Sequence, residues 1–568
     1  MQTQVLRGLL PAVAAVLLVG ACSGGEDPPP PQLGAARSGT LANCATLSGF
    51  AFASTQITAA SLVAAGTLSN AGAAVGEHCV VTGRMNTRIS PVDGQTYAIG
   101  FEMRLPRDWS GRYLYQGNGG TDGAVATATG AFSGGGPLRH ALQQGFAVIS
   151  SDAGHSGAQN PLFGLDPQAR LDYGYQAVGT LTPMAKALVS AAYGRGPDRS
   201  YIGGTSNGGR HTMVAAARYP ADYDGYLAIS PGFNLPKAAV AQLYGAQQWA
   251  RVATSNTNLE TALPQTERRL IANAILSRCD ALDGLADGLV QDVEACRSAF
   301  VLTRDVPTCT GARDGSCLTA DQKSAIGNVF AGARNTRGDA LYSSFAYDPG
   351  IVQTGWADWK FRNSVGAARD PVAVAFIFST PPESSSVLTN TLAYALGFSF
   401  DTDAPKIAAA GGIYMQSAMS FMTPPNPIQL DALRDRGAKM IVIHGTADGV
   451  FSSDDTEGWY RLLNTRYGGD AGVFTRLFSV PGMGHSRGGP ATDQFDGLSA
   501  LVAWVEQGTA PESMVATARG AGNAGGVNAE LPAAWSAART RPLCPWPKVA
   551  RYKGSGDIES AASFECRS

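Results

Sequence analysis

Short apolar stretches alternate along the chain with helical stretches. The apolar stretches are rich in β-branched or aromatic residues, and most end in Gly, Ser or Pro, which is typical of strands. The strand candidates are Tyr113–Gln116, Phe146–Ser150, Ser200–Ile202, Tyr226–Ser230, Met440–His444 and Phe474–Val480. Helical stretches such as Thr182–Tyr193 and Arg210–Tyr219 lie between them. This alternation predicts an α/β fold with a mostly parallel sheet that is covered on both faces.

The alternation breaks between Pro231 and about Leu430. This span contains several cysteines, an Asp/Gly-rich loop and scattered aromatic residues. We interpret residues 235–430 as a lid domain inserted into the core. Residues 44–234 and 431–568 are then the two parts of one α/β domain.

The first residues have the pattern of a targeting segment. Arg7 is followed by an apolar run from Leu9 to Ala21, the length of a signal-peptide core and too short to span a bilayer. Small residues then precede Cys22, so residues 1–22 are predicted to be a lipoprotein signal and Cys22 the lipidated residue. An ordinary cleaved signal is the alternative. Residues 23–43 are interpreted as a flexible tether that is Pro/Gly-rich through most of its length.

Composition and charge limit the kinds of molecule that the protein can bind. Lys and Arg number 43 against 45 Asp and Glu, which gives a formal charge of −2. Nucleic acid is excluded as the main partner because binding to phosphates needs a basic surface. We expect a monomer outside the cytoplasm that meets a membrane only through its lipid anchor. Ser23 after Cys22 favours the outer membrane or cell surface, and a periplasmic or secreted protein is the alternative.

The cysteines agree with an oxidising compartment. The chain has nine, and removing Cys22 leaves an even number. No C-x-x-C motif or Cys/His cluster suggests a metal site. Sequence alone leaves many pairings open, although the spacing suggests local bridges. These are Cys44–Cys79, Cys279–Cys296, Cys309–Cys317 and Cys544–Cys566.

A candidate nucleophile lies in Gly204-Thr205-Ser206-Asn207-Gly208. The G-x-S-x-G pattern alone is weak evidence, because a chain with 69 glycines produces such patterns by chance. Its context is more specific, since a strand candidate precedes it and a helix of small and apolar residues follows. Strand, sharp turn and helix are what a nucleophile elbow requires. The alternative is that Ser206 is only a turn or helix-capping residue.

A serine nucleophile needs a base. In the α/β-hydrolase order the acid and then the histidine follow the serine. His485 follows a strand candidate in a Gly-rich loop and is our candidate. His211 lies on the helix of Ser206 and would point away from it. His444 stands four residues before the candidate acid, and we interpret it as a pocket-wall or structural residue.

The base needs an orienting acid. Asp448 lies in the loop past the strand that contains His444, which makes it the candidate. Asp454 and Asp455 are rivals, interpreted as carboxylates of a loop or helix start.

Two backbone N–H groups must hold the developing oxyanion. One is expected from Asn207, directly after the nucleophile. The other is expected from Gly120, or its neighbour Gly119, in the Gly-rich loop that follows the strand at Tyr113. A plain Gly-rich turn is the alternative. The combination predicts two-step acyl transfer through an acyl-enzyme on Ser206.

Several long segments together resemble the tannase/feruloyl esterase family, over nearly all of the chain from about Cys44 to Cys566. The resemblance implies an α/β-hydrolase fold, a triad of Ser206, Asp448 and His485, and a lid that determines specificity. It also implies substrates that are esters of aromatic acids: gallates, ferulates, chlorogenate or terephthalate monoesters. The segments are SYIGGTSNGGRHTMVAAARYPADYDGYLAISPG, QGNGGTDG, SSDAGHSG, HGTADGVFSSDDT, VPGMGHSRGGPATDQFDGLSALVAWVEQG and RPLCPWPKVARYKGSGD…ASFEC.

The chain departs from that family at two positions. Many members have a cysteine directly before the nucleophile and another directly after the histidine, joined beneath the triad. Here the positions hold Thr205 and Ser486. The joint loss leaves no orphan thiol and predicts either compensating packing or a looser triad.

The predicted lid contains an acidic loop at residues 279–289. Hard oxygen ligands at this density suit Ca²⁺, and a solvated acidic loop is the alternative. The resemblance implies that the side chains of Asp280, Asp283 and Asp287 and the carbonyls of Leu285 and Leu289 bind a structural calcium ion.

Aromatic residues provide candidates for the wall of an acyl pocket. The candidates are Phe451, His444, Trp356, Trp359 and Phe378. Except for Phe451, beside the acid, the aromatic rings are individually more typical of a core.

Lys360 and Arg369 are candidates to bind a free carboxylate or a phenolic group of a substrate, but each alone is interpreted as a solvated surface charge. Residues 367–379 lack the pattern associated with terephthalate monoester hydrolases, so esters of phenolic acids are favoured. A serine peptidase and a non-catalytic surface-binding lipoprotein are the alternatives from other classes.

Overall fold

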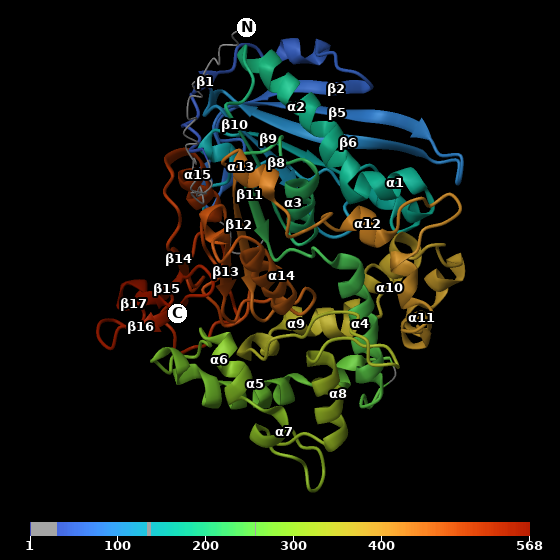
Figure 1. The fold of residues 1–568 in the computed structure, drawn as a ribbon, viewed down its shortest axis with the longest axis vertical. Coiled ribbons are helices and arrows are strands. Elements are labelled where there is room, and N and C mark those ends of the chain that lie inside the picture. Colours follow the sequence, from blue (N-terminus) through green and yellow to red (C-terminus); the bar gives the residue numbers. More distant parts are fainter. Residues whose placement is uncertain (2–30, 133–137, 256) are drawn as a thin grey trace.

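The computed structural model describes residues 1, 31–132, 138–255 and 257–568, and within them the main sheet has nine strands (Figure 1). The predicted signal peptide, Cys22 and residues 23–30 of the tether lie outside these residues. Across the sheet the strands are β13 (Thr475–Val480), β12 (Lys439–Gly445), β11 (Gly225–Ile229), β10 (Arg199–Thr205), β8 (Arg112–Gly117), β9 (Ala147–Ser151), β6 (Thr96–Pro106), β5 (His78–Ile89) and β2 (Thr55–Val63).

The strands from β13 to β9 run parallel, and β6, β5 and β2 continue the sheet antiparallel. Every predicted strand is present within the parallel part. The antiparallel strands were not predicted. In β2, for example, exposed and half-buried positions are mixed, whereas β11 and β12 are buried throughout. A sheet face open to water carries polar residues and so shows no continuous apolar run.

Helices cover both faces of the parallel strands, as predicted. Leu114 and Leu227 pack with Leu501 of α15 (Gly497–Gln507) on one face. Ile202 and Tyr113 belong to the core on the other face, with α2 (Ala177–Tyr193), α3 (Asn207–Arg218) and α14 (Ser453–Arg466). Adjacent strand residues point to opposite faces, so neighbours such as Tyr113 and Leu114 enter different cores.

Residues 235–430 join β11 to β12 and contribute no strand to the main sheet among the described residues. Most of the segment lies below the sheet in Figure 1, and its apolar core is continuous with the core on the α2 face. Its helices are α4 (Leu235–Ala250), α5 (Gln265–Cys279), α6 (Val293–Ala299), α7 (Leu302–Asp305), α8 (Ala320–Phe330), α9 (Thr354–Ala357), α10 (Asp370–Val372), α11 (Thr391–Gly397) and α12 (Ala418–Met422). We call residues 235–430 the inserted segment.

The C-terminal residues form two small antiparallel pairs, β14 (Met514–Thr517) with β15 (Thr540–Leu543), and β16 (Val549–Tyr552) with β17 (Phe564–Arg567). They pack against the acidic loop of the inserted segment: Arg551 donates to the carbonyl of Leu282 at 3.0 Å and pairs with Asp292 at 2.8 Å. The remaining short elements are β1 (Gly39–Thr40), β7 (Asp108–Trp109), β3 (Ser69–Asn70), β4 (Ala73–Ala74), α1 (Pro167–Leu171) and α13 (Asp431–Asp435).

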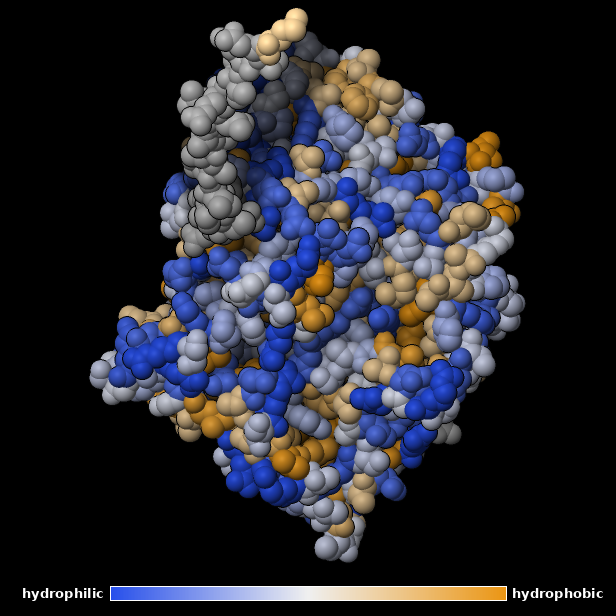
Figure 2. Space-filling view, viewed as in Figure 1, coloured by the Kyte–Doolittle hydropathy of each residue, from blue (hydrophilic) through white to orange (hydrophobic). Residues whose placement is uncertain are grey.

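The suggested local disulfides are confirmed. The structure contains Cys44–Cys79, Cys279–Cys296, Cys309–Cys317 and Cys544–Cys566. Figure 2 shows hydrophilic residues interspersed with small hydrophobic patches on one face of the molecule. Among the described residues, no helix combines the length and the apolar character needed to cross a membrane.

Candidate functional site

Ser206 occupies a sharp turn between β10 and α3. Its backbone has φ 64° and ψ −124°, a region that non-glycine residues rarely adopt. Close packing of three glycines permits the turn. A Cβ atom at Gly204 or Gly208 would collide with the carbonyl oxygen of Gly117 at the end of β8. The glycines of the G-x-S-x-G pattern are therefore a steric requirement here, which a chance match would not explain.

The three predicted triad residues form one hydrogen-bonded chain. His485 Nε2 lies 2.8 Å from Ser206 Oγ, and His485 Nδ1 lies 2.8 Å from Asp448 Oδ2. The other carboxylate oxygen, Asp448 Oδ1, accepts backbone N–H groups from Val450 at 2.9 Å and Phe451 at 3.0 Å. This arrangement matches a nucleophile, a base and an orienting acid.

Electrostatics keep the acid ionised. Burial acts to raise the pKa of Asp448, but His485 and His444 outweigh it and hold that pKa well below its usual range. The rival carboxylates have other partners. Asp454 pairs with Arg297, and Asp455 accepts hydrogen bonds from Asn234.

His444 is buried behind Asp448, and both ring nitrogens are occupied by protein partners. Its Nδ1 is 2.8 Å from Thr456 Oγ1, and its Nε2 is 3.3 Å from Asp448 Oδ2 and 3.1 Å from the carbonyl oxygen of Phe451. The side chain is fully buried. The assignment of His444 to the pocket was therefore wrong, and its alternative interpretation as a structural residue fits the contacts.

Two of the predicted pocket aromatics flank His485. The ring centroids of Trp359 and Phe451 lie 5.3 Å and 5.2 Å from that of His485, with both planes nearly perpendicular to the imidazole. Trp359 belongs to the inserted segment, so this segment reaches the candidate base directly.

Trp356 and Phe378 lie in a core, the alternative that the sequence favoured for each ring taken alone, so only the assignment of Trp356 to the pocket needs correction. Trp356 is 3% exposed and packs edge-on against Trp249 and Phe361, within the aromatic core of the inserted segment. Phe378 is fully buried in the same core. An aromatic side chain in a sequence carries no sign of whether it faces a substrate or a core.

Lys360 is not a solvated surface charge. Its side chain is 2% exposed, and Nζ lies 3.6 Å from the ring centroid of Phe345. Burial lowers the pKa of Lys360 to about 7, although Asp448 and Asp370 favour the charged form. Arg369, by contrast, is exposed.

Replacing Lys360 with methionine should reduce the change in the free energy of unfolding between about pH 7 and pH 10. Unfolded Lys360 binds a proton below its ordinary pKa of 10.5, whereas the folded residue does so only below about 7. Between these values the unfolded state holds more protons, so folding stability falls as pH falls, by up to about 1.4 kcal/mol per pH unit. Lys360→Met removes this contribution.

Urea unfolding at several pH values between 7 and 10 measures that dependence. The variant's gain over the wild type should be largest near pH 7 and shrink as pH rises. Lys553→Met, which replaces an exposed lysine, is the matched control and should leave the change of stability with pH as in the wild type. A gain for Lys360→Met that is constant with pH would contradict this interpretation.

The two predicted oxyanion donors lie beside Ser206. Asn207 begins α3, where backbone N–H groups have no partner within the helix. A Cβ at Gly119 would stand 4.0 Å from the Cβ of Ser206, so the loop of residues 117–123 passes next to the nucleophile.

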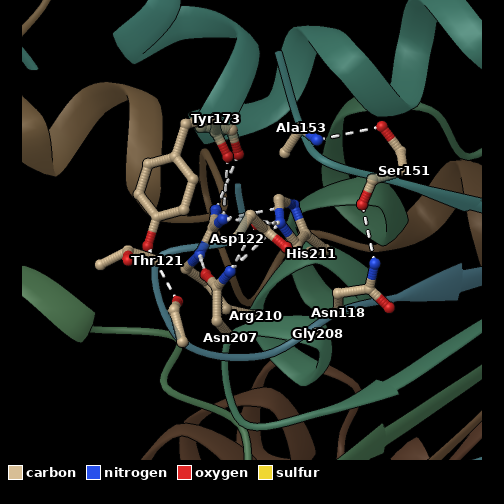
Figure 3. A network of polar contacts seen from close by, with 12 residues as sticks. Asn118, Thr121, Asp122, Ser151, Ala153, Tyr173, Asn207, Gly208, Arg210 and His211 are labelled. Carbon is tan, nitrogen blue, oxygen red and sulfur yellow. Dashed lines mark hydrogen bonds and ion pairs between the residues drawn. The ribbon is translucent and has the colours of Figure 1, made fainter. Parts of the chain in front are cut away.

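Sequence reasoning missed a buried polar network behind this loop (Figure 3). It joins Asp122 of the loop to Asn207, Arg210 and His211 of α3, with Asp122 Oδ2 2.8 Å from both Asn207 Nδ2 and His211 Nε2. Polar residues in the quoted segments QGNGGTDG and SNGGRH were the only signal.

The departures from the family's cysteine pair leave the triad contacts intact. Thr205 and Ser486 are both buried and flank Ser206 and His485. Both hydrogen bonds of His485 nevertheless measure 2.8 Å.

The acidic loop carries three neighbouring carboxylates. Asp280 Oδ1 accepts the N–H of Asp287 at 2.9 Å, and Asp283 Oδ1 accepts that of Leu285 at 3.0 Å. Burial, together with repulsion from Asp287 and Asp280, raises the pKa of Asp283 to about 7. Such crowding favours a bound cation.

Two further observations test the fit to calcium. Asp283 Oδ2 is buried and has no hydrogen-bond partner among the described residues, as an oxygen intended for a cation would be. Asp287, however, pairs with Arg541, and within the described chain no three acidic, His or Cys side chains form a ready metal-binding group. The donor chemistry fits Ca²⁺, while the side chains are not gathered around one point.

A model of the family described as tannase and feruloyl esterase matches residues 79–567. The mono(2-hydroxyethyl) terephthalate hydrolase of Piscinibacter sakaiensis is 40% identical over 529 residues, covering 87% of this chain and 85% of that protein. The probable feruloyl esterase B of Emericella nidulans is 29% identical over 493 residues, covering 82% and 83%.

Two solved structures share the architecture. Feruloyl esterase B from Aspergillus oryzae superposes with a TM-score of 0.73 at 23% identity, covering 92% of this chain and 99% of that one. Tannin acyl hydrolase from Aspergillus niger has a TM-score of 0.64 at 20% identity, with 91% and 92% covered. At these identities the likeness establishes the fold alone.

Proposed function

The chain belongs to the tannase and feruloyl esterase family, and we propose that it cleaves esters of aromatic acids through an acyl-enzyme on Ser206. Its α/β-hydrolase fold and its identity as a carboxylic ester hydrolase follow from the family and the relatives. The observation that carries the proposal is the unbroken chain of hydrogen bonds from Ser206 through His485 to Asp448.

The contacts support a two-step acyl transfer. His485 accepts the proton of Ser206 as its oxygen attacks the ester carbonyl, and the N–H groups of Asn207 and Gly120 stabilise the oxyanion. His485 then protonates the departing alcohol, and water repeats the sequence on the acyl-enzyme. Asp448 holds Nδ1–H of His485 and stabilises the imidazolium.

Esters of phenolic acids, such as feruloyl or galloyl esters, are the substrates that we favour. Trp359 and Phe451 beside His485 provide aromatic surface for such an acyl group. A terephthalate monoester is the second candidate, because the 40% identical relative is named for that substrate.

Hydrolysis of a small panel by the form lacking residues 1–22 tests the proposal. The panel is methyl ferulate, methyl gallate, mono(2-hydroxyethyl) terephthalate, p-nitrophenyl acetate and a peptide anilide. Turnover of an aromatic ester supports the proposal and identifies the acyl group. Turnover of the anilide alone would favour a peptidase. Turnover of none would favour a non-catalytic binding protein.

We also propose an extracytoplasmic location with a lipid anchor at Cys22. The four disulfides of the described chain support it, because such bridges persist in oxidising compartments. Mass spectrometry of the N-terminal peptide from membranes tests the anchor, and an unmodified Cys22 would contradict it.

The acidic loop is proposed to bind a structural Ca²⁺ through Asp280, Asp283, Asp287 and the carbonyls of Leu285 and Leu289. The buried, unpartnered Asp283 Oδ2 supports the proposal. Bound calcium would neutralise carboxylates that repel one another and would link the loop to its C-terminal neighbours.

Millimolar calcium should raise the melting temperature above that in EDTA by about 2 °C, because an ion that binds only the folded state stabilises it and a chain of this length needs about 1 kcal/mol per degree. Asp283→Asn should lose most of this shift, whereas the exposed control Asp435→Asn should keep it. Differential scanning calorimetry gives the measurement. An equal melting temperature with calcium and with EDTA would contradict the proposal.

A further inference from the structure

We propose that Asp122, acting through the side chain of Asn207, is a positioning residue that fixes the two oxyanion donors relative to one another. The inference rests on the proposed function of Ser206. The donors come from separate elements, the loop of residues 117–123 and the start of α3. Their backbone N–H groups can point at the same oxygen atom only if the loop and the helix are held at a fixed position relative to one another.

The side chain of Asn207 is fully engaged in this connection. Its Nδ2 donates to Asp122 Oδ2 at 2.8 Å, and its Oδ1 accepts from Arg210 Nε at 2.6 Å. A guanidinium only donates, so Oδ1 must face Arg210 and Nδ2 must face Asp122, which leaves one orientation of the amide. Asn207, which supplies one backbone donor, is thereby hydrogen-bonded to the loop that supplies the other donor.

A second set of hydrogen bonds also connects α3 to the loop of residues 117–123. Arg210 donates to the carbonyls of Gly174 at 2.7 Å and Tyr173 at 3.0 Å. The hydroxyl of Tyr173 in turn donates to the carbonyl of Gly120 at 3.3 Å. Figure 3 shows Tyr173, Arg210, Asn207 and Asp122 gathered in this network. Loop and helix are therefore connected twice.

Burial makes the network rigid and sensitive to deletion. The Asp122 side chain is 1% exposed, and His211 Nε2 lies 2.8 Å from the same oxygen that Asn207 contacts. Hydrogen bonds in such surroundings are strong, and a missing partner is not replaced by bulk water. Among the described residues, these side chains make no hydrogen bond to Ser206 Oγ or to His485, whose ring nitrogens bond Ser206 and Asp448.

Asn207→Ala tests the proposal, because it keeps the backbone N–H and removes only the side-chain connection. We expect kcat for the best ester of the panel to fall about 10–100-fold with KM within about twofold, since misplaced donors weaken the transition state selectively. Asp122→Ala should behave alike. Asp122→Asn should recover most of the loss, because its amide oxygen can replace Oδ2 as the acceptor.

A second measurement is the affinity for an aryl boronic acid, which forms a tetrahedral adduct with the serine. A residue with a merely structural role would not change this affinity selectively. The affinity should weaken in parallel with kcat in Asn207→Ala and Asp122→Ala, while inhibition by the free aromatic acid should not change. If Asn207→Ala does not fold, the Asp122→Ala and Asp122→Asn pair decides the question alone.

Tyr201→Phe is the matched control. Tyr201 lies on β10, five residues before Ser206, and donates to buried Glu506 at 2.7 Å. Its loss should lower the melting temperature without changing kcat or boronate affinity. Wild-type kcat and boronate affinity in Asn207→Ala, or equal losses in Asp122→Ala and Asp122→Asn, would overturn the inference. A wild type without Ser206-dependent turnover would instead overturn the proposed function.

Discussion

Ser206→Ala is expected to lower kcat/KM for aromatic esters by about 10⁵-fold, while the fold and melting temperature stay close to those of the wild type. The reason is that the hydroxyl is the only candidate nucleophile in contact with His485 among the described residues. Residual acceleration would come from the oxyanion donors and from substrate binding, which persist without the serine.

Steady-state kinetics and labelling by a fluorophosphonate measure this effect. The wild type should gain one label by intact mass, and Ser206→Ala none. Ser200→Ala is the matched control, because Ser200 is buried on the same strand but lies at its opposite end. Retention of more than about 1% of the activity by Ser206→Ala, or its stoichiometric labelling, would exclude the acyl-enzyme on this residue.

The parallel strands and the triad could be predicted because their signals are local. A buried parallel strand reads as a continuous apolar run, as in β12, and the polar residue that follows its end lies at the edge where sites form. Ser206, Asp448 and His485 each occupy such a place. The order of the three along the chain then completed the assignment.

The residue assignments that the sequence could not provide depend on contacts between distant segments of the chain. Trp356 and Trp359 are three residues apart, yet one faces the core and the other His485. Lys360 resembles a surface lysine until the fold buries it against Phe345. Asp122 and Asn207 are 85 residues apart, and only the folded chain shows that they touch. Side-chain direction and long-range pairing are not encoded in a local pattern.

The second large effect is expected for Asp448→Asn, with kcat reduced about 10⁴-fold and little change in KM. The N–H groups of Val450 and Phe451 both point at Oδ1, so the amide oxygen of the variant must occupy that position. The amide NH₂ then faces His485 Nδ1 in place of Oδ2. His485 must accept there and carry its proton on Nε2, where it faces Ser206 and can no longer act as a base.

His444→Gln separates this effect from a general disturbance around Asp448. His444 contacts the same oxygen at 3.3 Å but does not reach Ser206, so its replacement removes one supporting hydrogen bond and leaves the tautomer of His485 unchanged. We expect a loss in kcat of no more than about tenfold, the equivalent of one ordinary hydrogen bond. Asp448→Asn within tenfold of the wild type, or His444→Gln as impaired as Asp448→Asn, would show that Asp448 does not orient His485. If kcat falls far more in Asp448→Asn than in His444→Gln, Asp448 acts by fixing which nitrogen of His485 carries the proton. His444 then only supports the carboxylate with a hydrogen bond.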